Sequence, residues 1–184
     1  GDYFLLKRLG EGGMGEVFLA KAGAVADIEK LLVVKTLREQ HTEDAEYVRR
    51  FIDEARIVVQ LSHRNICPVF DVGKVSGQYY LAMEHIHDRD LKTLATRAQQ
   101  RGSPLAPEVC IFIVGEVLEA LDYAHRLTDP ATGAALELVH RDVSPHNVMV
   151  NFEGEAKLID FGLAASRLKV ERTRPDVVMG KMAY

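Results

Sequence analysis

The chain has 184 residues, of which 47% are hydrophobic and 27% are charged, and its 23 Lys and Arg against 27 Asp and Glu give a formal net charge of −4. This composition is typical of a globular domain and excludes a disordered or fibrous chain. The mild acidity excludes a generally basic protein, so we expect no nucleic-acid binding.

The first forty residues predict strands. Tyr3 to Leu9 is a run of aromatic and apolar residues that leads into a cluster of glycines, and residues 17–20 and 31–37 are β-branched and apolar. No helical pattern separates these three runs, so we expect them to form an antiparallel meander.

A helix is predicted after residue 42. Thr42 is a candidate cap, and the acidic residues that follow it suit the first turn of a helix. Two further strands, 69–72 and 79–83, are predicted around a turn at 74–77. The helical periodicity places these residues on one face: Phe51, Glu54, Ala55, Val58 and Leu61.

The second half of the chain predicts longer helices. Residues 91–100 form one helical pattern, and residues 109–127 form a second that is apolar on most faces, so we expect a mostly buried helix. Two short strands, 148–150 and 155–159, should form a hairpin. The change from strands to long helices near residue 85 predicts two lobes.

The cysteine count and the hydropathy bear on location. Cys67 and Cys110 are too few for a disulfide framework and indicate a reducing, cytoplasmic compartment. No apolar run approaches the ~18 residues that a spanning helix needs, so we expect no membrane contact within this segment. The first residue is Gly rather than Met, and we expect the complete protein to be longer.

A glycine-rich segment at residues 10–15 is the first candidate for ligand binding. Gly10, Gly12 and Gly15 would let the backbone turn sharply and approach a phosphate closely. Taken alone, the pattern fits a tight hairpin equally well. A strand follows it instead of a helix, which argues against a dinucleotide-binding loop, and the segment has no P-loop sequence.

Two charged residues occupy positions that should be apolar. Lys35 lies inside the apolar strand 31–37, and Glu54 shares a helix face with apolar residues. Each alone could be an exposed charge at an edge. Together with the glycine segment, they are better explained as an ion pair that directs Lys35 toward a phosphate.

Two short motifs carry polar groups to either end of the predicted hairpin. Asp142 and Asn147 lie in His-Arg-Asp-Val-Ser-Pro-His-Asn before it, and Asp160 lies in Asp-Phe-Gly after it. An amide and a carboxylate that converge there would be suitable oxygen ligands for Mg²⁺.

In order and spacing, the whole set of motifs resembles the protein kinase family, and bacterial serine/threonine kinases most. The resemblance implies an α+β, two-lobed fold. Residues 1–84 would form an N-lobe with an antiparallel sheet and one helix. Residues 85–184 would form part of a mainly helical C-lobe that ends in the activation segment.

The resemblance also implies a role for each matching residue. Gly10, Gly12 and Gly15 would cover the phosphates of ATP, while Lys35 would contact the α- and β-phosphates and be held by Glu54.

At the reacting atoms, Asp142 would orient the hydroxyl of a serine or threonine in a protein substrate and accept its proton, and Asn147 and Asp160 would hold Mg²⁺. Ser166 and Thr173 are candidate sites of autophosphorylation in the activation segment.

Around the adenine, the resemblance implies contacts from Val17, Val33 and Met149, with Met83 as the gatekeeper and Glu84 to Ile86 as the hinge. It further implies a hydrophobic stack of Val58, Val69, His140 and Phe161.

The chain departs from the family at two positions. Ser144 stands where serine/threonine kinases usually carry lysine, and Lys181 stands where they carry threonine. We hypothesise that the departures compensate, with Lys181 acting as a catalytic residue that supplies the cation lost at Ser144.

The chain also stops before the remaining helices of such a domain, so we expect the 184-residue segment to be poorly soluble or inactive alone. An alternative function is that of a weak or inactive pseudokinase that binds nucleotide as a signalling module. A phosphotransferase acting on small molecules and a tyrosine-specific kinase are further alternatives, which the motifs favour less.

Overall fold

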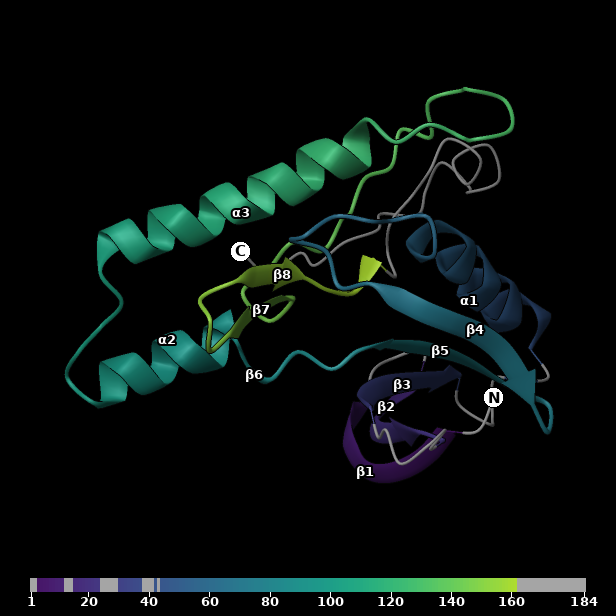
Figure 1. Ribbon diagram of the computed structural model, residues 1–184, viewed down its shortest axis with the longest axis horizontal. Helices are drawn as coiled ribbons and strands as arrows, with labels where there is room; N and C mark the ends of the chain where they lie inside the picture. The colour runs from purple at the N-terminus through teal and green to yellow at the C-terminus, as the bar shows by residue number, and fades with distance from the viewer. Residues whose placement is uncertain (1–2, 12–14, 24–29, 38–41, 43, 162–184) are drawn as a thin grey trace. The chain divides into compact units, whose positions relative to one another are not determined.

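The computed structural model describes residues 3–11, 15–23, 30–37, 42 and 44–161 (Figure 1). The chain divides into two compact units. Unit 1 comprises residues 1–62 and 68–85, and unit 2 comprises residues 63–67 and 86–184. Each unit is described by itself below.

Unit 1 is built on a five-stranded antiparallel sheet with the order β1-β2-β3-β5-β4. The antiparallel meander predicted for the first three strands is confirmed, and β5 then inserts between β3 and β4. The strands are β1 (Tyr3–Glu11), β2 (Gly15–Ala22), β3 (Leu31–Leu37), β4 (Val69–Val75) and β5 (Gln78–Glu84).

The alternation of side chains along β3 explains how this sheet is held. Leu32 and Val34 are buried. Val33 and Lys35, which alternate with them along the strand, are only partly buried and point to the opposite face. The buried face joins a compact cluster with residues of β2 and β5: Ala20, Leu32, Val34, Tyr80 and Ala82.

The turn between β4 and β5 is tighter than the sequence indicated. Val75 pairs with Gln78, so only Ser76 and Gly77 form the loop. Both have positive φ, 49° and 88°, as in the two-residue turn whose twist suits a β-hairpin.

Helix α1 (Ala45–Val58) confirms the predicted helix, but its predicted cap is wrong. The helix begins after Asp44, whose carboxylate accepts a hydrogen bond from the backbone N–H of Glu46 at 2.9 Å. Asp44 therefore satisfies a first-turn donor in place of Thr42. On the apolar face, Phe51, Ala55 and Val58 are buried as expected.

In the described part of unit 2, up to residue 161, there are two helices and a three-stranded sheet of order β6-β7-β8. The predicted helix 91–100 and the predicted hairpin are confirmed, whereas β6 was not expected. The elements are β6 (Asp88–Asp90), α2 (Leu91–Gln100), α3 (Pro107–His125), β7 (Val148–Asn151) and β8 (Ala156–Leu158).

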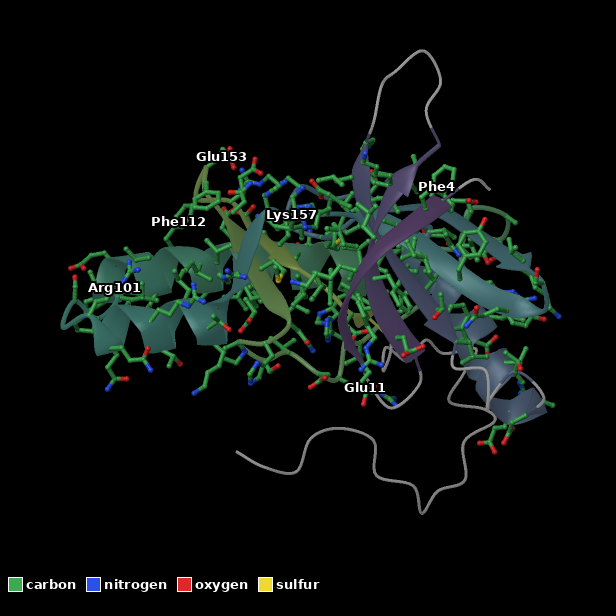
Figure 2. The ribbon with its side chains drawn as sticks, turned by 90° about the horizontal axis from the view of Figure 1, so that it is seen from below. Phe4, Glu11, Arg101, Phe112, Glu153 and Lys157 are labelled. Carbon is green, nitrogen blue, oxygen red and sulfur yellow. The ribbon has the colours of Figure 1, made fainter. Side chains whose placement is uncertain are left out.

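The expectation that α3 is mostly buried is wrong for the part of the chain described. Its buried side chains form one stripe, Ile113, Val117, Ala120 and Ala124, along the side that packs near β8. The opposite side is apolar but exposed, with Ile111 71% and Leu118 58% accessible, and Phe112 is also exposed (Figure 2). No helix in the described ranges is long and apolar enough to cross a membrane.

Residues 63–67 are held to unit 2 by polar contacts with α3 and β8. Arg64 pairs with Glu116 at 3.0 Å and with Glu119 at 2.7 Å. The buried Asn65 donates from Nδ2 to Glu116 and to the backbone oxygen of Ala156. These contacts explain why a segment that follows α1 in sequence belongs to unit 2.

Candidate functional site

The sheet of unit 1 brings four of the predicted nucleotide-site residues onto one face. In the strand register Val17 lies opposite Lys35, and Val33 lies opposite Met83. Directly opposed residues project to the same face of a sheet, and Val33 and Lys35 are two positions apart on β3. Val17, Val33, Lys35 and Met83 therefore share the face opposite the buried cluster.

The glycines at the ends of β1 and β2 differ in what they require. A Cβ atom at Gly15 would lie 2.1 Å from the backbone oxygen of Thr36, so only glycine allows β2 to approach β3 there. At Gly10, which pairs with Val17, a Cβ atom would meet nothing within 4 Å. Gly12 lies outside the described residues.

The structure describes less about the predicted partner of Lys35 and the predicted hinge. Glu54 lies in α1, but its side chain is outside the described part of the structure. Glu84 ends β5, and its backbone N–H donates to the oxygen of Pro68 at 3.1 Å. Ile86, predicted as part of the hinge segment, is buried in unit 2.

The loop between α3 and β7 brings Asp142 and Asn147 together. Nδ2 of Asn147 donates to the backbone oxygen of Asp142 at 2.8 Å and to its carboxylate Oδ2 at 3.0 Å. The backbone N–H of Asn147 also donates to the oxygen of Ser144 at 2.9 Å. Because Asn147 is only 8% exposed, these bonds fix the orientation of the Asp142 carboxylate.

Asp160 reaches the same region through the hairpin. The backbone N–H of Ile159 donates to the oxygen of Asn147 at 2.9 Å, so the residue before Asp160 is bonded to Asn147. Asp160 itself is exposed and has φ of 63°, and Arg141 has φ of 67°. Non-glycine residues in this region are uncommon and concentrate at functional sites.

His140 links these two segments. Its Nδ1 accepts the backbone N–H of Asp142 at 3.2 Å, and its Nε2 lies 3.1 Å from the oxygen of Ile159. Since a carbonyl can only accept, the proton belongs on Nε2 of a neutral ring. Burial lowers the pKa of His140, which agrees with a neutral side chain. The ring packs against Phe161 at 4.4 Å between centroids.

The donor set fits the predicted cation. Nδ2 of Asn147 is used within the loop, which leaves Oδ1 as the amide atom that a metal ion could bind. A carboxylate from Asp160 would complete a pair of hard oxygen ligands of the kind that Mg²⁺ prefers. Asn147 and Asp160 could therefore hold the ion.

Two further predicted positions lie in this unit. Met149 is partly buried in β7, where it pairs with Asp90 and Lys157. Ser144 is only 5% exposed, and its Oγ has no hydrogen-bond partner within the described part of the chain. Lys181, Ser166 and Thr173 lie outside the described residues.

Asp90 is not among the predicted site residues, yet it contacts the loop that carries Asp142 and Asn147. Its carboxylate accepts the backbone N–H of Thr93 at 2.9 Å and the Thr93 hydroxyl at 2.6 Å, so it caps α2. It also lies 3.7 Å from Nδ1 of His146, and the N–H of Lys92 donates to the oxygen of Pro145 at 3.0 Å. The signal in the sequence was an aspartate directly before the helical pattern that begins at Leu91.

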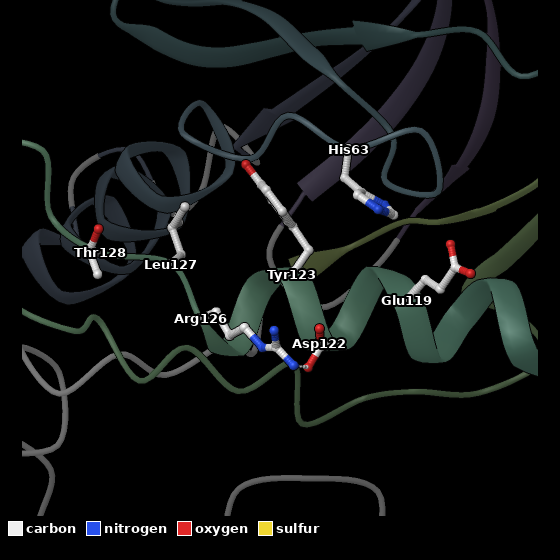
Figure 3. Close-up of a pocket in the computed structure, with 7 residues that line it drawn as sticks. All are labelled: His63, Glu119, Asp122, Tyr123, Arg126, Leu127 and Thr128. Carbon is white, nitrogen blue, oxygen red and sulfur yellow. Dashed lines mark ion pairs between the residues drawn. The ribbon is translucent and has the colours of Figure 1, made fainter.

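A separate hollow of about 510 Å³ lies in unit 2, where α3 meets residue 63 (Figure 3). His63 stacks on Tyr123 there at 5.1 Å, and Arg126 pairs with Asp122 at 2.8 Å. None of the predicted site residues lines it. The full lining is His63, Glu119, Asp122, Tyr123, Arg126, Leu127 and Thr128.

Comparisons with known proteins show which family the chain resembles. The family model of the protein kinase domain matches residues 3–184. The tyrosine-protein kinase MasK of Myxococcus xanthus is 35% identical over all of this chain and 28% of the relative. The serine/threonine-protein kinase PrkC of Bacillus subtilis is 32% identical over all of this chain and 26% of the relative.

Among solved structures, the PknI kinase domain of M. tuberculosis has a TM-score of 0.64 and 32% sequence identity, over 87% of this chain and 58% of that chain. The chain thus spans about a quarter of the length of the two curated relatives.

Proposed function

The chain belongs to the protein kinase family, and from that premise we propose that it transfers the γ-phosphate of ATP, with Mg²⁺, to a serine or threonine hydroxyl of a protein. The observation that carries the proposal is the hydrogen bond from Asn147 to the Asp142 carboxylate, in a loop bonded to the residue before Asp160. We also propose that residues 1–84 and 85–184 are the two lobes of an incomplete kinase domain.

In unit 1, the proposed role of the shared sheet face is to bind nucleotide. Gly10, Gly12 and Gly15 cover the phosphates, and Lys35 contacts the α- and β-phosphates with Glu54 as its partner. The position of Lys35 on the same face as three apolar side chains supports this assignment, because adenine needs an apolar surface beside the phosphates.

The adenine is assigned to the apolar side chains. Val17, Val33 and Met149 contact its faces. Met83 is the gatekeeper. The backbone of Glu84 to Ile86 bonds the edge of the ring.

In unit 2, the proposed role of Asp142 is to act on the substrate hydroxyl. As the hydroxyl oxygen bonds to the γ-phosphorus, the bond from phosphorus to the leaving oxygen of ADP breaks, and the hydroxyl proton passes to Asp142. Asn147 holds the carboxylate in place for this transfer through its Nδ2. When bound by Asn147 and Asp160, Mg²⁺ supplies charge neutralisation on the phosphates.

The substituted positions bear on how active the protein is. Ser144 gives the loop a buried hydroxyl instead of a cation, which favours the alternative of a weak or inactive pseudokinase. We propose instead that Lys181 supplies the cation. The acceptor also has an alternative, because one relative is named a tyrosine kinase and another a serine/threonine kinase.

Autophosphorylation of the complete protein with labelled ATP tests the proposal. We expect the protein to incorporate labelled phosphate, and Asp142→Asn and Lys35→Met to abolish this incorporation. Mass spectrometry should locate the phosphate on Ser166 or Thr173. Lys181→Ala should also abolish transfer, and Ser144→Lys with Lys181→Thr should restore it. ATP binding without any incorporation would establish the pseudokinase, and full activity in Lys181→Ala would reject the role of Lys181.

A further inference from the structure

The strand that leads into the glycine segment is paired with β2 but buries few of its side chains. Every residue of β1 after Tyr3 is exposed, including the apolar side chain of Phe4 (Figure 2). The pairing of β1 with β2 contains two register shifts, between Leu5 and Lys7 and between Arg8 and Gly10. Interrupted pairing and missing burial both weaken a strand.

Ion pairs at the glycine end of β1 contribute little. Arg8 contacts Glu16 at 2.8 Å and Glu11 at 3.1 Å, and the Arg8 and Glu11 side chains are more than half exposed. Exposed ion pairs of this kind stabilise a folded structure only weakly, because water screens the charges. Apart from its backbone pairing with β2, the side-chain contacts that could hold β1 in place therefore lie at its other end.

Tyr3 is the residue that attaches this other end. Its ring packs against the buried cluster of unit 1 and meets the ring of Tyr80 edge to face, with 5.6 Å between centroids and 70° between planes. Its hydroxyl donates a hydrogen bond to Oδ2 of Asp71 at 2.9 Å.

Asp71 connects β1 to the far edge of the sheet. The order β1-β2-β3-β5-β4 puts β1 and β4 at opposite edges, yet Tyr3 on β1 bonds directly to Asp71 on β4. The hydroxyl of Tyr80 on β5 donates to the same carboxylate oxygen, also at 2.9 Å. A bond between the two edge strands requires the sheet to curl, and it then holds that curvature (Figure 1).

The Tyr80 side chain is tightly packed against the neighbouring strand. Gly73 lies opposite Tyr80, and a Cβ atom at this position would sit 2.5 Å from the Tyr80 hydroxyl. Burial and the hydrogen bond to Asp71 raise the pKa of Tyr3 to about 12. The hydroxyl therefore stays protonated and able to donate throughout the neutral range.

We propose that Tyr3, Asp71 and Tyr80 form a clamp across the sheet that fixes β1 and thereby positions its far end, at Gly10, for nucleotide binding. Tyr3 and Asp71 are positioning residues in this proposal. Their role in nucleotide binding rests on the proposed function, whereas the attachment of β1 does not.

The test compares Tyr3→Phe and Asp71→Asn with Tyr79→Phe in the complete protein. Tyr79 precedes Tyr80 on β5, and its hydroxyl meets only the exposed Lys74 among the contacts described, at 3.3 Å. Hydrogen exchange of the β1 amides is measured without nucleotide. Loss of a hydrogen bond to a carboxylate should speed this exchange by about tenfold or more in Tyr3→Phe, and Tyr79→Phe should leave it unchanged.

The same variants are then titrated with ATP and Mg²⁺ by calorimetry, and kcat is measured. We expect the dissociation constant for ATP to rise by about threefold or more with kcat within about twofold, since the clamp acts on binding rather than on the reacting groups. Unchanged exchange in Tyr3→Phe would refute the clamp whatever the activity. Faster exchange with an unchanged ATP dissociation constant would refute its positioning role. If Tyr3→Phe speeds the exchange of β1 but the parent protein transfers no phosphate, the result would count against the proposed function alone.

Discussion

The amide group of Asn147 shows what a single residue contributes beyond its motif. Its position opposite Asp160 at the ends of the predicted hairpin, together with the resemblance to protein kinases, predicted a metal ligand, and the donor chemistry fits that prediction. The structure adds that Nδ2 of the same amide orients the Asp142 carboxylate. A pattern of residue types cannot specify which atom of an amide faces which neighbour, because that depends on how the loop closes between Ser144 and Asn147.

Gly15 permits a prediction at the residue scale. Gly15→Ala would place a methyl group against the backbone oxygen of Thr36, and neither atom can move without opening the pairing of β2 with β3. We expect the free energy of unfolding to fall by about 1–3 kcal/mol. Denaturant unfolding measures it, with Gly10→Ala as the matched control because a methyl group there meets nothing within 4 Å. Equal stability of the two variants would contradict the close approach.

Secondary-structure elements divide into those that local sequence specifies and those that depend on pairing. Strand β3 was predicted with its observed bounds, because a β-branched apolar run between loops leaves few alternatives. Strand β6 was not, since its three residues are polar and become a strand only by pairing with β7. The sequence favours Thr42 as the cap of α1 over the observed Asp44 because both are good caps and lie only two positions apart.

The N-terminus of α2 allows a prediction at the element scale. Asp90→Ala removes both hydrogen bonds to Thr93, so we expect it to cost about 1 kcal/mol of unfolding free energy. Asp90→Asn keeps an acceptor for the backbone N–H and should cost less. Thermal and denaturant unfolding of both variants check this, and an alanine variant as stable as the parent protein would show that the cap does not stabilise α2.

The whole molecule confirms the fold class that the motifs implied, a protein-kinase-like α+β fold with an antiparallel sheet and part of a helical lobe. It also shows an apolar side of α3 that nothing in the described part of unit 2 covers. The solved kinase domain is longer, since this chain spans 58% of it. Exposed apolar surface of this kind promotes association in water.

We therefore predict that the 184-residue segment is poorly soluble on its own. Ile111→Lys with Leu118→Lys should raise its soluble yield severalfold, because both side chains are more than half exposed and lie on the same side of α3. Sedimentation of the purified segment measures this, and Lys substitutions at the exposed Gln99 and Gln100 of α2 provide the control. A soluble and monomeric parent segment would contradict the prediction.

The sequence by itself determined the family, the order of the strands and helices apart from β6, and the residues proposed to bind nucleotide and metal. It could do so because hydrophobic periodicity and short motifs are local properties of the chain. Only the tertiary structure decided which atoms meet: Asn147 with Asp142, Asp90 beside His146, and Tyr3 with Asp71 across the sheet. These contacts depend on how loops close and how the sheet curves, and local patterns of residue types do not predict either property.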